Sequence, residues 1–229
     1  MKTKSLIFTL LLNSIICLSQ ENRVIENVLY KPTESEKARK YYNEAIDYFE
    51  EKNFEKAVEL YKLAIIEDPN YIDAYDNLGL SYRHLNLLDS AESYYLLSHS
   101  KYPKGTVAIG NLAVVQEFKG NSEGAIAYYK QSIELEPENP EGYYGLSRIQ
   151  LNVKKYGEAF KNGQLAEKYY KQINSPYIGD CYYLLCLICY NNKDKQLSQK
   201  YLALSKAAGI AVDKNLEKNL KQKLQFTFR

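Results

Sequence analysis

The chain has 229 residues, enough for one extended repeat array or for one or two compact domains. It contains 23 Tyr, no Trp, 11 Gly and only 6 Pro, so turn-forming residues are sparse and long helices are favoured over a sandwich of short strands. With 30 Lys and Arg against 28 Asp and Glu, the composition argues against a nucleic-acid-binding protein with one dominant basic field.

Residues 1–19 predict a secretory signal peptide. Lys2 and Lys4 precede an apolar run over residues 6–18, and the small residue Ser19 follows it. The run is interrupted by polar residues and is shorter than the roughly 20 residues of a spanning helix, so a retained membrane anchor is the alternative. Cleavage after Ser19 would leave 28 basic residues against 28 acidic ones. The leader indicates export to the periplasm or envelope of a Gram-negative bacterium, or to the extracellular space.

Residues 20–37 form a leader segment between the signal peptide and the regular part of the chain. Their stretch "RVIENVLY" places four apolar side chains on one face of a possible helix, namely Val24, Ile25, Val28 and Leu29. Three interpretations stay open: a disordered leader, an N-terminal cap, or a segment that folds back onto a binding groove.

The rest of the chain repeats with a period of 34 residues. Three columns of small residues recur at this spacing: Ala57, Ala91, Ala125 and Ala159; Ala45, Gly79, Ala113 and Ser147; Ala64, Ser98, Ser132 and Ala166. A proline ends each of the first three units, at Pro69, Pro103 and Pro137. Two antiparallel helices approach closely only where side chains are small, so each unit is predicted to be a helical hairpin.

The best-preserved unit has large residues around its small ones. They are Tyr75, Leu78, Gly79, Tyr82, Ala91, Tyr95 and Pro103. This pattern resembles the tetratricopeptide repeat family. The resemblance implies an all-α, right-handed α-solenoid of about five helical hairpins, over 38–71, 72–105, 106–139, 140–173 and a degenerate 179–212.

The fourth unit departs from the pattern at two places. Gly163 occupies the column of the aromatic residue, so we expect loose packing of the second helix there. Lys171 replaces the closing proline, and a short insertion follows before the fifth unit. After the repeats, residues 213–229 are predicted to form a capping helix, because Leu216, Leu220 and Leu224 are spaced four apart and the last hairpin must hide an apolar face.

Few residues are suited to chemistry. The chain has two histidines, His84 and His99, and no phosphate-binding glycine loop or zinc-protease motif. Cys181, Cys186 and Cys189 lie on one predicted helix without a nearby histidine, so we interpret them as packing residues, with a disulfide as the alternative. We therefore expect no enzyme activity, no catalytic residues, no metal and no cofactor.

The resemblance implies that the first helices line a concave groove for a peptide or protein partner. Asn43, Asn77 and Asn111 recur along it, either to bond a peptide backbone or to bond between repeats. The predicted groove residues are Tyr42, Asn43, Ile46, Phe49, Asp76, Asn77, Leu80, Arg83, Asn111, Val114, Phe118, Tyr144, Arg148, Tyr183 and Leu187. Only Asn77 fits the subclass that clamps a C-terminal carboxylate, so that specificity is not expected.

The sequence thus predicts a non-catalytic interaction scaffold of the bacterial cell envelope. Nucleic acid is not expected as a partner, and membrane contact is expected only if the leader is retained. Two alternatives remain: an architectural module that self-associates through its terminal repeats, and a membrane-tethered subunit of an envelope complex.

Overall fold

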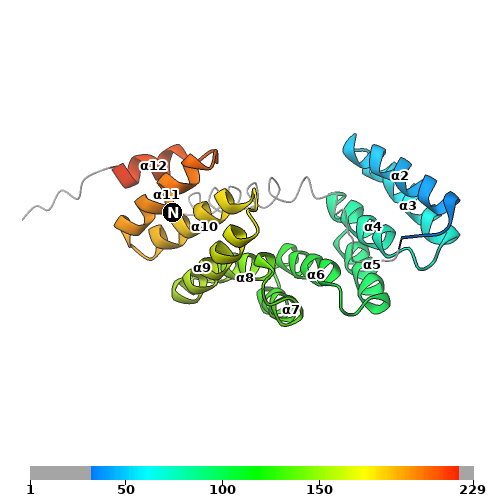
Figure 1. Ribbon diagram of the computed structural model, residues 1–229, viewed down its shortest axis with the longest axis horizontal. Helices are drawn as coiled ribbons and strands as arrows, with labels where there is room; N and C mark the ends of the chain where they lie inside the picture. Colours follow the sequence, from blue (N-terminus) through cyan, green and yellow to red (C-terminus); the bar gives the residue numbers. More distant parts are fainter. Residues whose placement is uncertain (1–31, 222–229) are drawn as a thin grey trace, which may run out of the picture.

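The computed structural model describes residues 32–221, which fold into helices without a strand (Figure 1). The helices are α2 (Glu36–Glu50), α3 (Phe54–Glu67), α4 (Ile72–His84), α5 (Leu88–Lys101), α6 (Thr106–Phe118), α7 (Ser122–Leu135), α8 (Pro140–Asn152), α9 (Tyr156–Gln172), α10 (Ile178–Asn191), α11 (Lys195–Ala207) and α12 (Lys214–Lys221). The predicted signal peptide, most of the leader segment and the end of the predicted capping helix lie outside the described residues. No helix within 32–221 has the length and apolar character needed to cross a bilayer.

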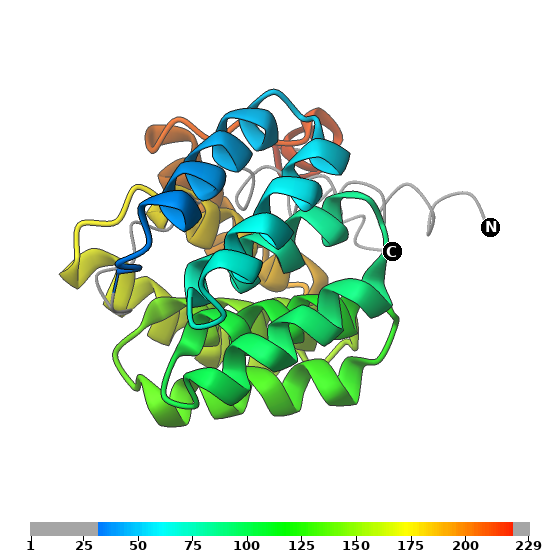
Figure 2. The same ribbon diagram turned by 90° about the vertical axis from the view of Figure 1, so that its right-hand side faces the viewer.

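The helices pair in chain order into five hairpins, α2 with α3 through α10 with α11, and α12 follows the last one. The hairpins stack side by side into a curved array, with α2 and α3 at one end of the longest axis and α12 at the other (Figure 1). Turned by 90°, the array shows its helices stacked in successive layers (Figure 2). The predicted all-α solenoid of about five hairpins is confirmed.

The first helices of the hairpins lie on the inner side of the curve. Helix α4 contacts α6, α6 contacts α8, and α8 contacts α10, while each second helix contacts the first helix of the next hairpin. Direct contact between successive first helices draws them closer together than the second helices. The array therefore curves with the first helices inside (Figure 1).

Small residues mark the points where two helices approach most closely. A Cβ at Gly79 would lie 2.7 Å from the ring of Tyr95, and one at Gly145 would lie 2.1 Å from the ring of Tyr129. Both tyrosines project from the second helix of their hairpin and are buried. Gly79 therefore makes room for a tyrosine within its own hairpin, and Gly145 on α8 makes room for a tyrosine of the preceding hairpin.

The turn inside each of the first four hairpins uses a left-handed residue at the same repeat position. The backbone φ is +62° at Lys52, +58° at Asn86, +75° at Gly120 and +63° at Lys154, each 34 residues after the last. The residue that follows donates its N–H to a carbonyl five residues earlier, as from Lys155 to Gln150 at 2.8 Å. Such a bond closes a Schellman motif and ends the first helix.

The expectation of loose packing in the fourth hairpin is wrong. A Cβ at Gly163 would lie 2.7 Å from a methyl carbon of Leu185, so the side chain from α10 fills the space of the missing aromatic residue. Gly163 is buried, and its carbonyl oxygen lies 3.5 Å from Sγ of Cys181. With Lys171 in place of proline, α9 continues to Gln172 and is the longest helix of residues 32–221.

Helix α12 closes the array by packing on α11. Its Leu216 and Leu220 are buried in the last core cluster, and Nε2 of Gln199 donates to the carbonyl oxygen of Leu220 at 2.6 Å. The carboxylate of Asp213 accepts the backbone N–H of Leu216 at 2.7 Å and so caps the start of the helix. The apolar face of the last hairpin is covered in this way.

Candidate binding surface

The predicted groove residues all lie on first helices, but their exposure divides them into two sets. The exposed or partly exposed set is Asn43, Ile46, Phe49, Asn77, Leu80, Arg83, Asn111 and Phe118. The buried set is Tyr42, Asp76, Val114, Tyr144, Arg148, Tyr183 and Leu187. All four predicted groove residues after residue 118 fall in the buried set. The surface available on the inner side is therefore centred on α2, α4 and α6.

Asn77 links the first two hairpins. Its Nδ2 donates to the hydroxyl oxygen of Tyr42 at 2.7 Å. The ring of Tyr42 packs against Tyr71 and Tyr61, with ring centroids 4.7 Å and 5.6 Å away. Burial raises the pKa of Tyr42, so its hydroxyl stays neutral. Of the two functions considered for the recurring asparagines, peptide binding and bonding between repeats, Asn77 thus performs the second.

The other asparagines of the column differ from Asn77. Asn43 is exposed and Asn111 partly exposed, and neither makes a side-chain hydrogen bond within residues 32–221. Their amides therefore remain accessible on the inner helices. Ile46 and Leu80, three residues after Asn43 and Asn77, are also partly exposed.

An aromatic cluster joins the turn ends of the first two hairpins. The ring of His84 stacks on Phe54 with centroids 4.6 Å apart, and Phe49 meets both rings edge-on at 5.2 Å. Phe49, predicted to face the groove, thus also packs between the hairpins. A histidine held in this way has a structural function whether or not it contacts a partner.

Arg148 forms a buried polar network instead of an open surface. Its Nη2 donates to Oε1 of Glu117 at 2.6 Å and to the hydroxyl oxygen of Tyr129 at 2.9 Å. The hydroxyl of Tyr129 donates to the same carboxylate at 2.6 Å. Burial raises the pKa of Tyr129 well above its usual value, and the negative charge of Glu117 adds to the shift. The network connects α6, α7 and α8.

The sequence carries a signal for this network. The residues 34, 68 and 102 positions before Arg148 are Val114, Leu80 and Ile46, so a charge interrupts an apolar column. An opposite charge, Glu117, lies on the preceding first helix. Two opposite charges on adjacent first helices, one of them in an apolar column, indicate a buried ion pair.

The remaining predicted groove residues belong to the core of the last hairpins. Tyr144 packs edge-on against Tyr170 with centroids 6.1 Å apart, and it shares a core cluster with Tyr183 and Leu187. The hydroxyl of Tyr170 donates to Glu141 at 2.9 Å. A change at Tyr144 would therefore alter packing as well as any partner contact.

The three cysteines of α10 lie in the same core and are free thiols. Sγ of Cys186 lies 3.4 Å from Oγ of Ser198, and burial raises the pKa of Cys189 to about 12. Burial also raises the pKa of Cys181, which disfavours a reactive thiolate. Within the described range no three His, Cys, Asp or Glu side chains are placed to hold a metal ion.

Two family profiles match parts of the chain. Profiles described as tetratricopeptide repeat match residues 72–98 and 107–139, and residues 128–168. The chain therefore contains tetratricopeptide repeats. Proteins built from such repeats are generally non-catalytic scaffolds for protein–protein interaction.

Solved structures share the fold at low sequence identity. PilF of Pseudomonas aeruginosa superposes with a TM-score of 0.69 at 18% identity, over 81% of this chain and 83% of that one. MamA of Desulfovibrio magneticus RS-1 superposes with a TM-score of 0.62 at 14% identity, over 83% of this chain and 100% of that one. At these identities the likeness concerns the fold alone.

A curated relative matches a shorter region. The protein O-mannosyl-transferase TMTC3 of Mus musculus is 28% identical over 120 residues, which cover 46% of this chain and 13% of TMTC3. The chain thus matches only a small part of that protein, and the name describes the activity of TMTC3 as a whole.

Proposed function

We propose that the chain is an exported interaction scaffold that holds an extended polypeptide along its first helices. The observation that carries the proposal is the accessible amide column on the inner side. Asn43, Asn77 and Asn111 recur at the same position of α2, α4 and α6; Asn43 and Asn111 make no side-chain hydrogen bond within residues 32–221, while the partly exposed Asn77 donates one amide hydrogen to Tyr42. A primary amide both donates and accepts hydrogen bonds. It can therefore pair with a peptide group of an extended chain, whatever the side chains of that chain are.

Apolar side chains beside the amides supply the remaining contact. Ile46 and Leu80 are partly exposed on α2 and α4, and Phe118 is 43% exposed at the end of α6. Apolar side chains of a partner would lose water on contact with them, while the amides fix the direction of its backbone. This combination favours a polypeptide ligand with some apolar residues over a small polar molecule.

The leader is the basis for the proposed place of action. A cleaved signal peptide would put the scaffold in the periplasm or envelope of a Gram-negative bacterium, and a retained leader would tether it to the membrane as a subunit of an envelope complex. N-terminal sequencing of the chain recovered from envelope fractions separates the two. A start at residue 20 supports the soluble exported form, whereas an intact start at Met1 favours the tethered one.

Affinity capture from a native envelope extract tests the groove. The bait is the full chain, compared with Leu80→Glu and with Leu97→Glu as a matched control, because Leu97 is 45% exposed on the second helix α5 of the same hairpin. A protein held by wild type and by Leu97→Glu but lost from Leu80→Glu supports groove binding. Equal retention by all three baits, or loss only from Leu97→Glu, contradicts it.

A further inference from the structure

The nearly neutral chain is divided into two oppositely charged parts. Residues 32–139, through α7, carry 11 Lys and Arg against 19 Asp and Glu, a net charge of −8. Residues 140–221, from α8 onward, carry 13 Lys and Arg against 7 Asp and Glu, a net charge of +6. Because the hairpins follow one another along the array, the two signs occupy opposite ends of the longest axis (Figure 1).

The acidic end has its carboxylates at the turn of the first hairpin. Five acidic side chains are exposed there, namely Asp47, Glu50, Glu51, Glu55 and Glu59. Within residues 32–221 only the last of them forms an ion pair, with Lys56 at 2.7 Å. Lys52 and Lys56 lie in the same stretch, so residues 47–59 of the first hairpin carry five acidic side chains against two lysines, a net charge of −3.

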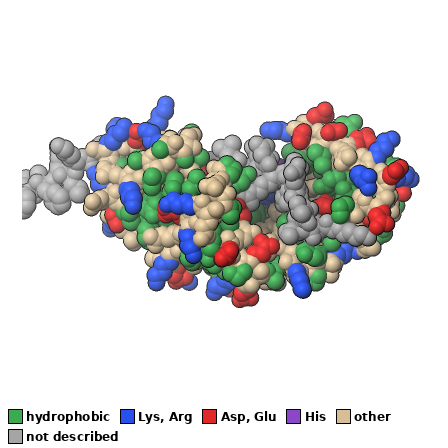
Figure 3. Space-filling model, viewed as in Figure 1, with side chains coloured by type: hydrophobic (Ala, Val, Ile, Leu, Met, Phe, Trp, Pro, Cys, Tyr) green, Lys and Arg blue, Asp and Glu red, His purple; other side chains and the backbone are tan. Residues whose placement is uncertain are grey.

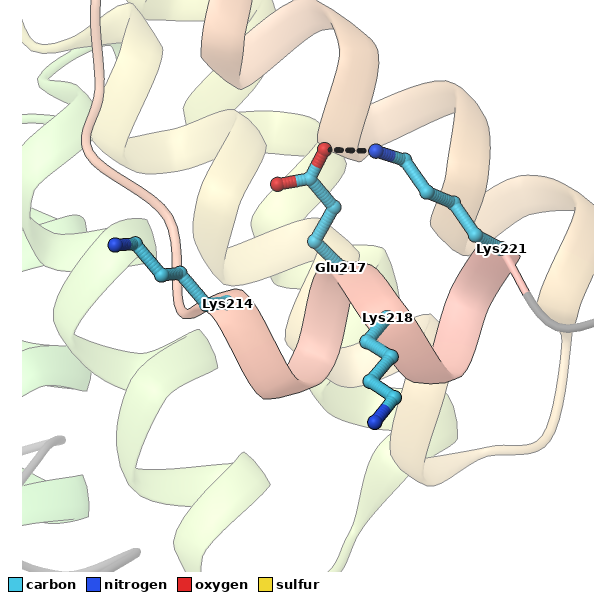
Figure 4. A pocket seen from close by; sticks show the side chains of 4 residues that line it. All are labelled: Lys214, Glu217, Lys218 and Lys221. Carbon is cyan, nitrogen blue, oxygen red and sulfur yellow. Dashed lines mark ion pairs between the residues drawn. The ribbon is translucent and has the colours of Figure 1, made fainter.

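The basic end has a shallow hollow on α12. The described residues that line it are Lys214, Glu217, Lys218 and Lys221 (Figure 4). Glu217 pairs with Lys221 at 2.7 Å and with Lys206 at 2.8 Å. Lys214 and Lys218 are exposed and make no ion pair within the described part of the chain, so their charges remain available. Lys and Arg side chains also gather over this end of the molecular surface (Figure 3).

We infer that copies of the chain dock end to end, with the lysine face of α12 of one copy against the carboxylates of the α2–α3 turn of the next. The two faces belong to one molecule and have opposite charge, so a second copy complements both at once. An anionic lipid surface would match the lysine face alone and would repel the acidic end.

The contact joins two different surfaces, so a dimer still has one free end of each kind. Such heterologous contacts extend into chains unless the rotation between copies closes a ring. Of the inner helices, only the turn end of α2 takes part in this contact. Assembly of this kind therefore sets several binding grooves in a row and goes beyond the proposed function of a single groove.

Charge reversal at either end tests the inference with the full chain. Asp47→Lys with Glu51→Lys changes the net charge of residues 47–59 from −3 to +1, and Lys214→Glu with Lys218→Glu changes that of residues 214–221 from +2 to −2. Lysines near the end of α2 and the Lys214→Glu change at the start of α12 agree with the helix dipoles, whereas Lys218→Glu lies in the last turn of α12 and opposes its dipole. Circular dichroism of each variant therefore checks that the helical content is kept. Sedimentation velocity should show wild-type association in low salt that weakens at least about tenfold in high salt and in each variant alone.

Mixing the two variants is the decisive arm. In an equimolar mixture, the lysine face of one variant can meet the intact carboxylates of the other, and the two reversed faces can also pair. Association should therefore return to the wild-type level. Glu134→Lys with Glu138→Lys reverses two exposed charges in the middle of the array and should associate like wild type. Wild type that stays monomeric in low salt, or a mixture that fails to recover, overturns the inference. Monomeric wild type that binds anionic vesicles through α12 would assign the lysine face to lipid instead.

Discussion

Nη2 of Arg148 lies 2.6 Å from Oε1 of Glu117, and the two side chains are only 6% and 8% exposed between α8 and α6. A charge that is removed from water needs an opposite charge and hydrogen bonds nearby, and Tyr129 supplies a further hydrogen bond. The pair ties the third hairpin to the fourth. Arg148 therefore acts as a structural residue of the solenoid.

Arg148→Met should destabilise the protein by about 3–5 kcal/mol, because it leaves the carboxylate of Glu117 buried without its partner. The double variant with Glu117→Met removes both charges and should recover most of that loss. Urea unfolding followed by circular dichroism measures both effects. Strictly additive losses in the double variant would mean that the two side chains do not stabilise each other.

Gly79→Ala should destabilise the second hairpin by about 1–3 kcal/mol, since the new Cβ would lie 2.7 Å from the ring of Tyr95. Gly79→Leu should be worse. Gly110→Ala is the matched control on α6, where no atom lies within 4 Å of the added carbon, and it should stabilise by about 0.5–1 kcal/mol. Thermal unfolding measures both effects. A midpoint that shifts in the same direction in both alanine variants would refute the assigned packing.

Lys154→Gly should raise the free energy of unfolding by up to about 1 kcal/mol, because Lys154 holds φ at +63°, where glycine carries no Cβ penalty. Lys161→Gly, at an exposed position inside α9, should lower it by a similar amount. Chemical denaturation of the two variants tests the sign. A loss of stability in Lys154→Gly would contradict the proposed cost of the left-handed lysine.

Asp73 should make stability depend on pH. Burial raises the pKa of its carboxyl from the usual 3.8 to about 6, so the folded chain binds the proton more tightly than the unfolded chain. Stability relative to Asp73→Asn should therefore fall as pH rises from about 4 to about 6 and stay level above that. The neighbouring hydroxyls of Tyr42 and Tyr71 remain protonated in this window, since burial raises both pKa values. Parallel pH profiles of the two proteins would refute the shift.

The repeat spacing predicts most of the fold because one packing problem recurs every 34 residues. Ala57, Ala91, Ala125 and Ala159 each lie fully buried on the second helix of a hairpin. The loss of proline at Lys171 coincides with the extension of α9 to Gln172. Such features depend on local geometry, which the sequence of one unit specifies.

The inner surface is less predictable. The repeat register shows on which helix face a residue lies, but it does not show which side chains of adjacent helices cover that residue. Arg148 lies on a first helix as predicted, yet the position of Glu117 on the adjacent helix decides its burial. Leu185 fills the space at Gly163 from the next hairpin, which no column of the fourth repeat indicates. Contacts between units depend on particular pairs of side chains from two repeats, and a pattern shared by all repeats does not specify such pairs.

Site-specific photo-crosslinking tests the central claim most directly. A photoreactive phenylalanine analogue at Leu80 on α4 is compared with the same analogue at Leu97 on α5, in full chains exposed to native envelope extract. A discrete crosslinked polypeptide from position 80 that is absent from position 97 is the result expected for a ligand held along the first helices. Crosslinks from position 97 alone, or the same products from both positions, would contradict the groove and assign partner binding to another surface.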